Sequence, residues 1–263
     1  MTEARIADSY KRNWGAALRA LRKLLANGDD TQQVFIIMRS LNGTSTRKGY
    51  DRLLQDPAGA RMAYERVELA ERLSDPDYVA GFAPGTLGAA YRDFLAETGY
   101  TAAGLVEVSN IDNPLEQIRH PYAWFGRRTR DVHDLWHVLT GYKADETLGE
   151  AALVAFSYAQ TGGLGWAWIG AGAALKSLRE TKSTLFAKGV WEGYRHGKQA
   201  HWLLGEDWDV LLHQPIDEVR ARLNIREPVA YRRAQRELGA ALASYASKQK
   251  AKAEAQAVDA ALA

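Results

Sequence analysis

Two histidines and two carboxylates near the middle of the chain have the residue types and the spacing of a metal site. His133, Asp134 and His137 lie within one short segment, and Glu150 follows after a polar turn. On an α-helix, with about 100° between successive residues, His133 and His137 point about 40° apart, and Asp134 points about 100° from His133. All three can face one point, and an antiparallel second helix could bring Glu150 there. Nitrogen and carboxylate donors suit zinc, iron, cobalt or manganese, so the four residues predict a divalent-metal site.

The two histidines also have an ordinary explanation, because residues four apart share a face on any amphipathic helix. The neighbouring carboxylates argue against it. Val132, Leu135 and Trp136 make the segment apolar, and burying Asp134 beside them costs free energy unless a cation is paired with it. The carboxylates therefore favour a metal.

Three known classes of metal site fit the segment poorly. In zincin-type proteases, a His-Glu-x-x-His helix supplies two ligands and the general base, but here the shorter Asp134 replaces that Glu. An HD-type phosphohydrolase needs another histidine upstream, and His120 has an unfavourable helical spacing from His133. A ferritin-like dimetal bundle needs Glu-x-x-His motifs on two helices, and the sequence contains none.

The elements that position these residues are predicted to be helices. Apolar residues recur at spacings of three and four along most of the chain, whereas strict alternation is not sustained. A helix from about residue 122 to 140 would carry the histidines, and Gly141 follows where a left-handed cap is expected. A second helix would begin near residues 145–147. The predicted fold class is all-α, with a single multi-helix domain.

One stretch without Asp, Glu, Lys or Arg, residues 151–175, is long enough to span a bilayer. Gly162 and Gly163 lie at its middle, which favours two shorter apolar helices over a membrane span. The small residues of the second half could leave an apolar tunnel between helices, lined by Trp166 and Trp168. Ordinary core packing explains the same residues equally well.

Composition narrows the class of protein. A chain of 263 residues with 46% hydrophobic content can form one large domain with modest extensions. A formal charge of +2 predicts no nucleic-acid partner, and zero cysteines exclude thiolate ligands. The first thirty residues fit neither a secretory signal nor a transit peptide, which favours the cytoplasm.

The segment around the candidate ligands strongly resembles the coenzyme Q biosynthesis protein 4 family. That family's signature, His-Asp-x-x-His, a Gly four residues later, then Gly-Glu opening an apolar helix, corresponds to His133, Asp134, His137, Gly141, Gly149 and Glu150. The turn before Glu150 is one residue longer than in the family pattern, which a loop can absorb. The region from Trp191 to Ile225 also resembles the family, so that the likeness covers roughly residues 30–227. The resemblance thus implies a metal- and lipid-binding domain at 30–227, with an N-terminal extension containing an amphipathic helix at 1–29 and a basic helix with a frayed tail at 228–263.

The resemblance implies an all-helical protein that binds a polyprenylated hydroxybenzoate-type precursor of ubiquinone together with a divalent metal. It implies a metal-dependent enzyme acting in C1 oxidative decarboxylation, which combines decarboxylation with hydroxylation of the ring, with His133, Asp134, His137 and Glu150 as catalytic residues and metal ligands. The alternative is a non-catalytic, lipid-presenting scaffold with a structural metal that organises the other ubiquinone biosynthesis enzymes. A position on the inner face of the bacterial plasma membrane is expected, and assembly as a homodimer is left open.

Two arginines precede the metal segment and are candidates for substrate binding. Arg130 lies three residues before His133, on nearly the same helix face, and Arg127 lies one turn earlier. A guanidinium group can hold a carboxylate or phosphate through two parallel hydrogen bonds. The alternative is that these arginines are solvated or pair with Asp131.

Overall fold

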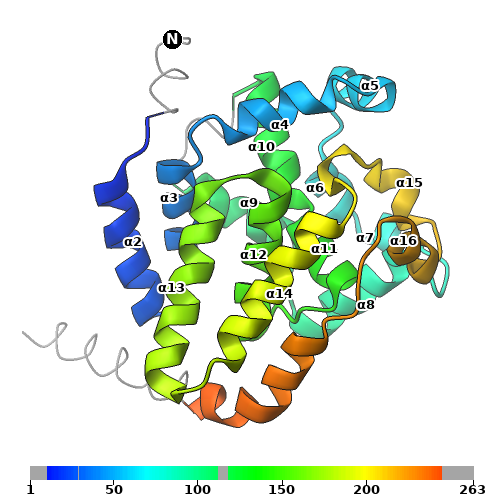
Figure 1. Ribbon diagram of the computed structural model, residues 1–263. Helices are drawn as coiled ribbons and strands as arrows, with labels where there is room; N and C mark the ends of the chain where they lie inside the picture. The colour runs from blue at the N-terminus through cyan, green and yellow to red at the C-terminus, as the bar shows by residue number, and fades with distance from the viewer. Residues whose placement is uncertain (1–10, 29, 112–117, 245–263) are drawn as a thin grey trace, which may run out of the picture.

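The computed structural model describes residues 11–28, 30–111 and 118–244, and within these ranges the fold is all-helical (Figure 1). This confirms the predicted fold class. No strand occurs among those residues, and Thr86 and Pro215 form an isolated antiparallel bridge. The tail beyond residue 244, for which fraying is predicted, lies outside the described residues. The helices are α2 (Trp14–Ala26), α3 (Thr31–Leu41), α4 (Ser45–Leu53), α5 (Pro57–Glu65), α6 (Leu69–Leu73), α7 (Pro76–Ala80), α8 (Leu87–Thr98), α9 (Ala102–Asn110), α10 (Pro121–Asp131), α11 (His133–Thr140), α12 (Thr147–Thr161), α13 (Leu164–Thr181), α14 (Leu185–Gln199), the 3₁₀ turn η1 (Leu203–Gly205), α15 (Trp208–Leu212) and α16 (Ile216–Arg222). Residues 229–244 are also helical.

Helix α12 lies at the centre of the fold and packs against α13 and α14 (Figure 1). Its side chains are buried along almost its whole length, as expected for a helix that is apolar on every side. A Cβ atom at Gly193 would lie 2.2 Å from the carbonyl oxygen of Ala152. Only glycine therefore allows α14 to approach α12 so closely.

Helices α2 and α3 form a pair that packs on the outer side of α13 (Figure 1). The side chain of Asn13 accepts a hydrogen bond from the backbone N–H of Ala16 and caps the start of α2. Ala17, Leu21 and Ile37 belong to a separate small apolar core between these helices. The amphipathic helix predicted near the N-terminus is thus α2, with one face buried.

The uncharged stretch is divided between two helices, as the glycines in its middle predict. Helix α12 ends at Thr161, Gly162 has a positive φ of 68°, and α13 begins at Leu164. In the part of the chain that the structure covers, no helix is long and apolar enough to cross a membrane.

The single helix expected from about residue 122 to 140 is interrupted at Val132. Its backbone N–H is shared between the carbonyl oxygens of Arg128 and Arg130, and α11 begins at the next residue. The N–H of Trp136 still bonds to the carbonyl of Val132 at 3.0 Å, so the helical turn that carries the histidines is intact.

Candidate metal centre

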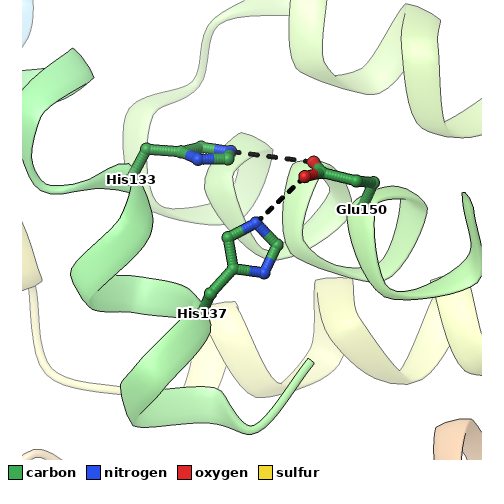
Figure 2. A group of neighbouring side chains, drawn as sticks. All are labelled: His133, His137 and Glu150. Atoms are coloured by element: carbon green, nitrogen blue, oxygen red, sulfur yellow. Dashed lines mark ion pairs between the residues drawn. The ribbon is translucent and has the colours of Figure 1, made fainter. Parts of the chain in front are cut away.

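The candidate metal centre lies between α11 and α12. His133 is the first residue of α11 and His137 lies one turn later, so both imidazoles extend from the same side of the helix. Gly141 ends α11 with a φ of 72°, a conformation that favours glycine, and the chain then turns into α12, which carries Glu150. Figure 2 shows the three side chains pointing toward one another from the two helices.

The distances are short enough for one ion to contact all three side chains. His137 Nε2 lies 3.3 Å from Glu150 Oε1, and His133 Nε2 lies 4.0 Å from Glu150 Oε2. One potential ligand atom from each residue lies within 4.8 Å of those from the other two. Two imidazoles and a carboxylate facing one point could hold a divalent cation and leave positions for other ligands.

The His137 ring is fixed in an orientation that suits a metal ligand. Its Nδ1 lies 2.8 Å from the carbonyl oxygen of Tyr142, and because a carbonyl only accepts, this contact assigns the proton to Nδ1. The lone pair of Nε2 then points toward Glu150. Nε2 is buried and has no hydrogen bond, since its contact with Glu150 has ion-pair distance without hydrogen-bond geometry. A buried nitrogen without a hydrogen bond, facing a carboxylate, fits a bound cation.

His133 is held by neighbours on two sides. Asp134 Oδ1 lies 3.5 Å from His133 Nδ1, which leaves His133 Nε2 directed at Glu150. The Trp166 ring stacks on His133 with the ring centroids 6.0 Å apart, and Phe94 stacks in the same manner on His137 at 6.3 Å. Asp134 therefore stands behind His133, outside the group of three, and its predicted role as a metal ligand stays a prediction.

The electrostatics of the group couple Glu150 to the histidines. Burial raises the pKa of Glu150, but the charges of His137 and His133 outweigh burial and lower it below its ordinary value of 4.5. Burial lowers the pKa of His133, but the contacts with Asp134 and Glu150 raise it above 6.5. Although 41% of the Glu150 side chain is exposed, Glu150 lines a cavity. Without a metal, His133 and Glu150 thus stabilise each other's charged forms.

A cavity of about 1530 Å³ adjoins the site. His133, Asp134 and Glu150 line it, together with Trp166, whereas the more deeply buried His137 does not. Apolar residues from five helices form much of the remaining wall: Leu24 and Leu25 of α2, Val34 and Met38 of α3, Leu105 and Val108 of α9, Val154 of α12, and Ile169 and Ala173 of α13. The candidate ligands therefore face a large and mostly apolar space.

The remaining predicted residues lie around this centre with partners of their own. Arg127 pairs with Glu68, with a shortest contact of 2.6 Å, and does not line the cavity. Arg130 borders the cavity but pairs with the adjacent Asp131 at 2.7 Å, the alternative considered from the sequence. Trp168 packs edge-on against Trp14 rather than facing the cavity.

Two residues that support the site were missed by the sequence analysis. Tyr142 contributes a backbone oxygen, which no residue type can indicate in advance. Phe94 comes from α8, and only the packing of α8 against α11 places its ring on His137.

The fold and the site together define an all-helical protein with a His-His-Glu group on the wall of a large cavity. The model of one protein family, coenzyme Q (ubiquinone) biosynthesis protein Coq4, matches residues 13–229. The chain belongs to this family, as the sequence resemblance predicted.

Curated relatives carry the same designation. The ubiquinone biosynthesis protein COQ4 homolog, mitochondrial, of Danio rerio is 36% identical over 182 residues, which are 68% of this chain and 63% of the relative. The mitochondrial ubiquinone biosynthesis protein coq4 of Pyrenophora tritici-repentis is 30% identical over 195 residues, 71% of this chain and 63% of the relative. The chain thus spans less than two thirds of these relatives.

A solved structure shares the fold. The crystal structure of a protein provisionally assigned to ubiquinone biosynthesis in Nostoc punctiforme superposes with a TM-score of 0.60, over 82% of this chain and 100% of the other, at 23% identity. At this identity the likeness supports the fold alone.

The relatives correct one expectation from the sequence. A position on the inner face of a bacterial plasma membrane was predicted, whereas the curated relatives are named as mitochondrial proteins. The prediction was wrong because it rested on the absence of a targeting pattern in the first thirty residues, and such an absence cannot identify a membrane.

Proposed function

We propose that this protein binds a polyprenylated hydroxybenzoate-type precursor of ubiquinone and a divalent metal, and that it acts in the C1 oxidative decarboxylation of the ring. The observation that carries this proposal is the convergence of His133, His137 and Glu150 at the wall of the large apolar cavity. The reaction replaces the carboxylate at ring carbon C1 by a hydroxyl group and releases carbon dioxide, which is a two-electron oxidation. We propose dioxygen as the oxidant and as the source of the hydroxyl oxygen, so that two ring carboxylic acids and one dioxygen give two phenols and two molecules of carbon dioxide.

The cavity supports a substrate with a long apolar tail. Its volume of about 1530 Å³ exceeds the roughly 300–1,000 Å³ of sites for small drug-sized ligands. In this proposal, side chains from α2, α3, α9, α12 and α13 would surround an isoprenoid chain, and the cavity would serve as the apolar tunnel predicted from the sequence. The polar ring would then lie at the wall formed by His133 and Glu150.

The residues around the ring have distinct tasks in this proposal. A bound divalent metal supplies a Lewis acid that can hold a carboxylate or phenolate oxygen and stabilise developing negative charge. His133, His137 and Glu150 would hold that ion, and Asp134 and the Tyr142 carbonyl would keep the two imidazoles in the required orientation. Trp166 flanks His133 at the cavity wall.

Elemental analysis of the purified protein, combined with mass spectrometry of extracted lipids, tests both ligands together. We expect about one divalent metal per chain and a co-purifying isoprenoid. His133→Ala and Glu150→Gln should lose the metal, whereas His201→Ala, at an exposed histidine outside the group, should keep it. Metal-free wild-type protein would contradict the metal site.

The same variants separate catalysis from a scaffold with a structural metal. In cells lacking the endogenous protein, His133→Ala and Glu150→Gln should stop quinone synthesis and accumulate the carboxylated prenyl precursor. If metal loss lowers thermal stability and partner binding, and the purified metal-loaded wild type never turns over a prenylated substrate, the scaffold is correct.

We also propose that the protein is peripheral to a membrane, through the outward surfaces of α2, α13 and α14. These helices lie side by side on one face of the fold (Figure 1). Large apolar side chains are exposed there: Trp14, Leu18, Leu175, Leu178 and Trp191. The exposed charged side chains of these three helices are all positive: Arg19, Arg22, Lys23, Arg179, Lys188, Arg195 and Lys198. Exposed apolar and basic side chains together suit an anionic lipid surface, from which a prenylated substrate would come.

A further inference from the structure

The helical segment 229–244, hereafter the C-terminal segment, continues beyond the region that matches the family. It packs into the main core through Tyr231, Ala234 and Leu238, all of which are buried. A Cβ at Gly189 would lie 3.4 Å from the Cα of Tyr231, so the segment passes close to α14. Residues Gln235, Gly239, Leu242 and Ala243 line the same cavity as the candidate ligands.

The start of the C-terminal segment is fixed by a carboxylate from α14. The two oxygens of Glu192 accept hydrogen bonds from the backbone N–H groups of Ala230 and Tyr231, both at 2.9 Å. An anion at a helix N-terminus satisfies backbone donors that otherwise lack partners and also interacts favourably with the helix dipole. Tyr231 is therefore held in a defined position.

The hydroxyl group of Tyr231 joins the C-terminal segment to the turn between α11 and α12. It donates a short hydrogen bond to Glu146 and accepts one from the backbone N–H of Lys143 at 3.0 Å. Gln235 Nε2 donates to both oxygens of Glu146, each at 3.0 Å. Burial, together with the bond to Glu146, raises the pKa of Tyr231, so the hydroxyl keeps the proton that it donates.

These contacts lead from Tyr231 to two of the three candidate ligands. Glu146 is the residue immediately before α12, and its carbonyl accepts the backbone N–H of Glu150 at 3.1 Å. The Tyr231 ring also packs edge-on against the Tyr142 ring, with the centroids 5.1 Å apart. The carbonyl of Tyr142 is the oxygen that holds His137 Nδ1.

We propose that Tyr231 is a positioning residue for the metal centre, which sets the placement of Glu150 through Glu146 and of His137 through Tyr142. The inference rests on the proposed metal site. It assigns a role in the centre to a segment outside the region that matches the family. Groups behind metal ligands influence affinity because they fix ligand orientation before the ion binds.

A cobalt(II) titration of the full-length protein tests this role. The visible absorption of cobalt(II) depends on the number and geometry of its ligands, so one titration reports both affinity and coordination. Tyr231→Phe removes one hydroxyl group and keeps the ring that packs on Tyr142. We expect about tenfold weaker cobalt binding and an altered spectrum. Tenfold is at the lower end of the loss in metal affinity that follows when a group that orients a metal ligand is removed.

A second tyrosine provides the matched control. Tyr194 stacks on Tyr158 near the end of α12, whereas Glu150 lies near its start. Tyr194→Phe should leave both affinity and spectrum unchanged. Glu146→Gln, which changes the acceptor rather than the donor, should alter the cobalt spectrum in the same way as Tyr231→Phe. Thermal unfolding of each metal-free variant reports any loss of stability separately.

The outcomes distinguish this inference from the proposed function. If wild-type protein binds cobalt, His133→Ala does not, and Tyr231→Phe matches the wild type within twofold and in spectrum, the positioning role is overturned and the metal site stands. If Tyr231→Phe only lowers the unfolding temperature of the metal-free protein, its role is structural and the inference also fails. Absence of cobalt binding by the wild type overturns both.

Discussion

The imidazole Nδ1 of His137 lies 2.8 Å from the carbonyl oxygen of Tyr142, in the turn that follows α11. This contact keeps the proton on Nδ1 and directs Nε2 toward Glu150 Oε1, 3.3 Å away. The same turn leads into α12, which carries Glu150. The turn between α11 and α12 thus sets both the orientation of His137 and the position of Glu150.

Asp134 should influence metal affinity because its carboxylate contacts His133 Nδ1 at 3.5 Å. Asp134→Asn keeps the size of the side chain and removes its charge, which makes the imidazole a weaker donor to a metal. We expect zinc affinity to fall about tenfold or more, measured by competition with a chelating dye. Asp145→Asn, at an exposed acid in the turn before α12, is the matched control. Equal affinities for the two variants would exclude any role of Asp134, as a ligand or behind one.

The stability of the metal-free protein should depend on pH through the His133 and Glu150 pair. The pKa of His133 is raised above 6.5, so the contribution of His133 to stability is complete below pH 6.5 and is lost as the pH rises through the raised pKa. The pKa of Glu150 is lowered below 4.5, so its contribution is complete above that value and is lost as the pH falls through the lowered pKa. Both contributions are complete between pH 4.5 and 6.5.

The difference in Tm between wild type and Glu150→Gln should therefore be largest in that window and smaller at about pH 8. Stabilisation by zinc should change in the opposite direction and grow with pH, because a metal requires deprotonated histidine. Differential scanning fluorimetry with and without zinc measures both trends. A Tm difference that does not vary with pH would show that the pair contributes nothing.

The sequence predicted the grouping of His133, His137 and Glu150 better than it predicted the groups that contact them. His133 and His137 follow from helical spacing alone, and Glu150 from a short turn between helices. The Tyr142 carbonyl could not be predicted, because a backbone oxygen leaves no mark in the sequence. Tyr231 could not be predicted either, since its contact with Glu146 depends on how α14 and the C-terminal segment pack.

Gly149 should be required for the close fit between the turn and the first part of α12. A Cβ at this position would lie 2.0 Å from the carbonyl oxygen of Lys143 and 2.7 Å from its backbone nitrogen, and neither atom can move without displacing the turn. Gly149→Ala should destabilise the protein by about 1–3 kcal/mol, as overpacking does, and should weaken metal binding because Glu150 is adjacent. The measurements are urea unfolding and zinc affinity.

Gly170 in α13 is the matched control, since its Cβ would meet other atoms no closer than 3.5 Å. Gly170→Ala in a helix interior should be neutral or stabilise by about 0.5–1 kcal/mol. If both variants have the same stability and metal affinity, the contact at Gly149 does not constrain the site.

Binding to anionic vesicles should depend on the outward surfaces of α2, α13 and α14. Each basic side chain near an anionic membrane contributes about 1 kcal/mol to binding, so Arg19→Ala combined with Arg195→Ala should weaken binding roughly thirtyfold.

The control replaces two exposed basic residues on other helices, Lys48 of α4 and Arg222 of α16, by alanine and makes the same change in net charge. Co-sedimentation with vesicles of phosphatidylcholine and phosphatidylglycerol measures the affinities, which should fall with added salt because exposed charges are screened. Equal losses of affinity for the two double variants would show that net charge, rather than this face, governs binding. Equal affinity of the wild type for vesicles of pure phosphatidylcholine would exclude the electrostatic contribution.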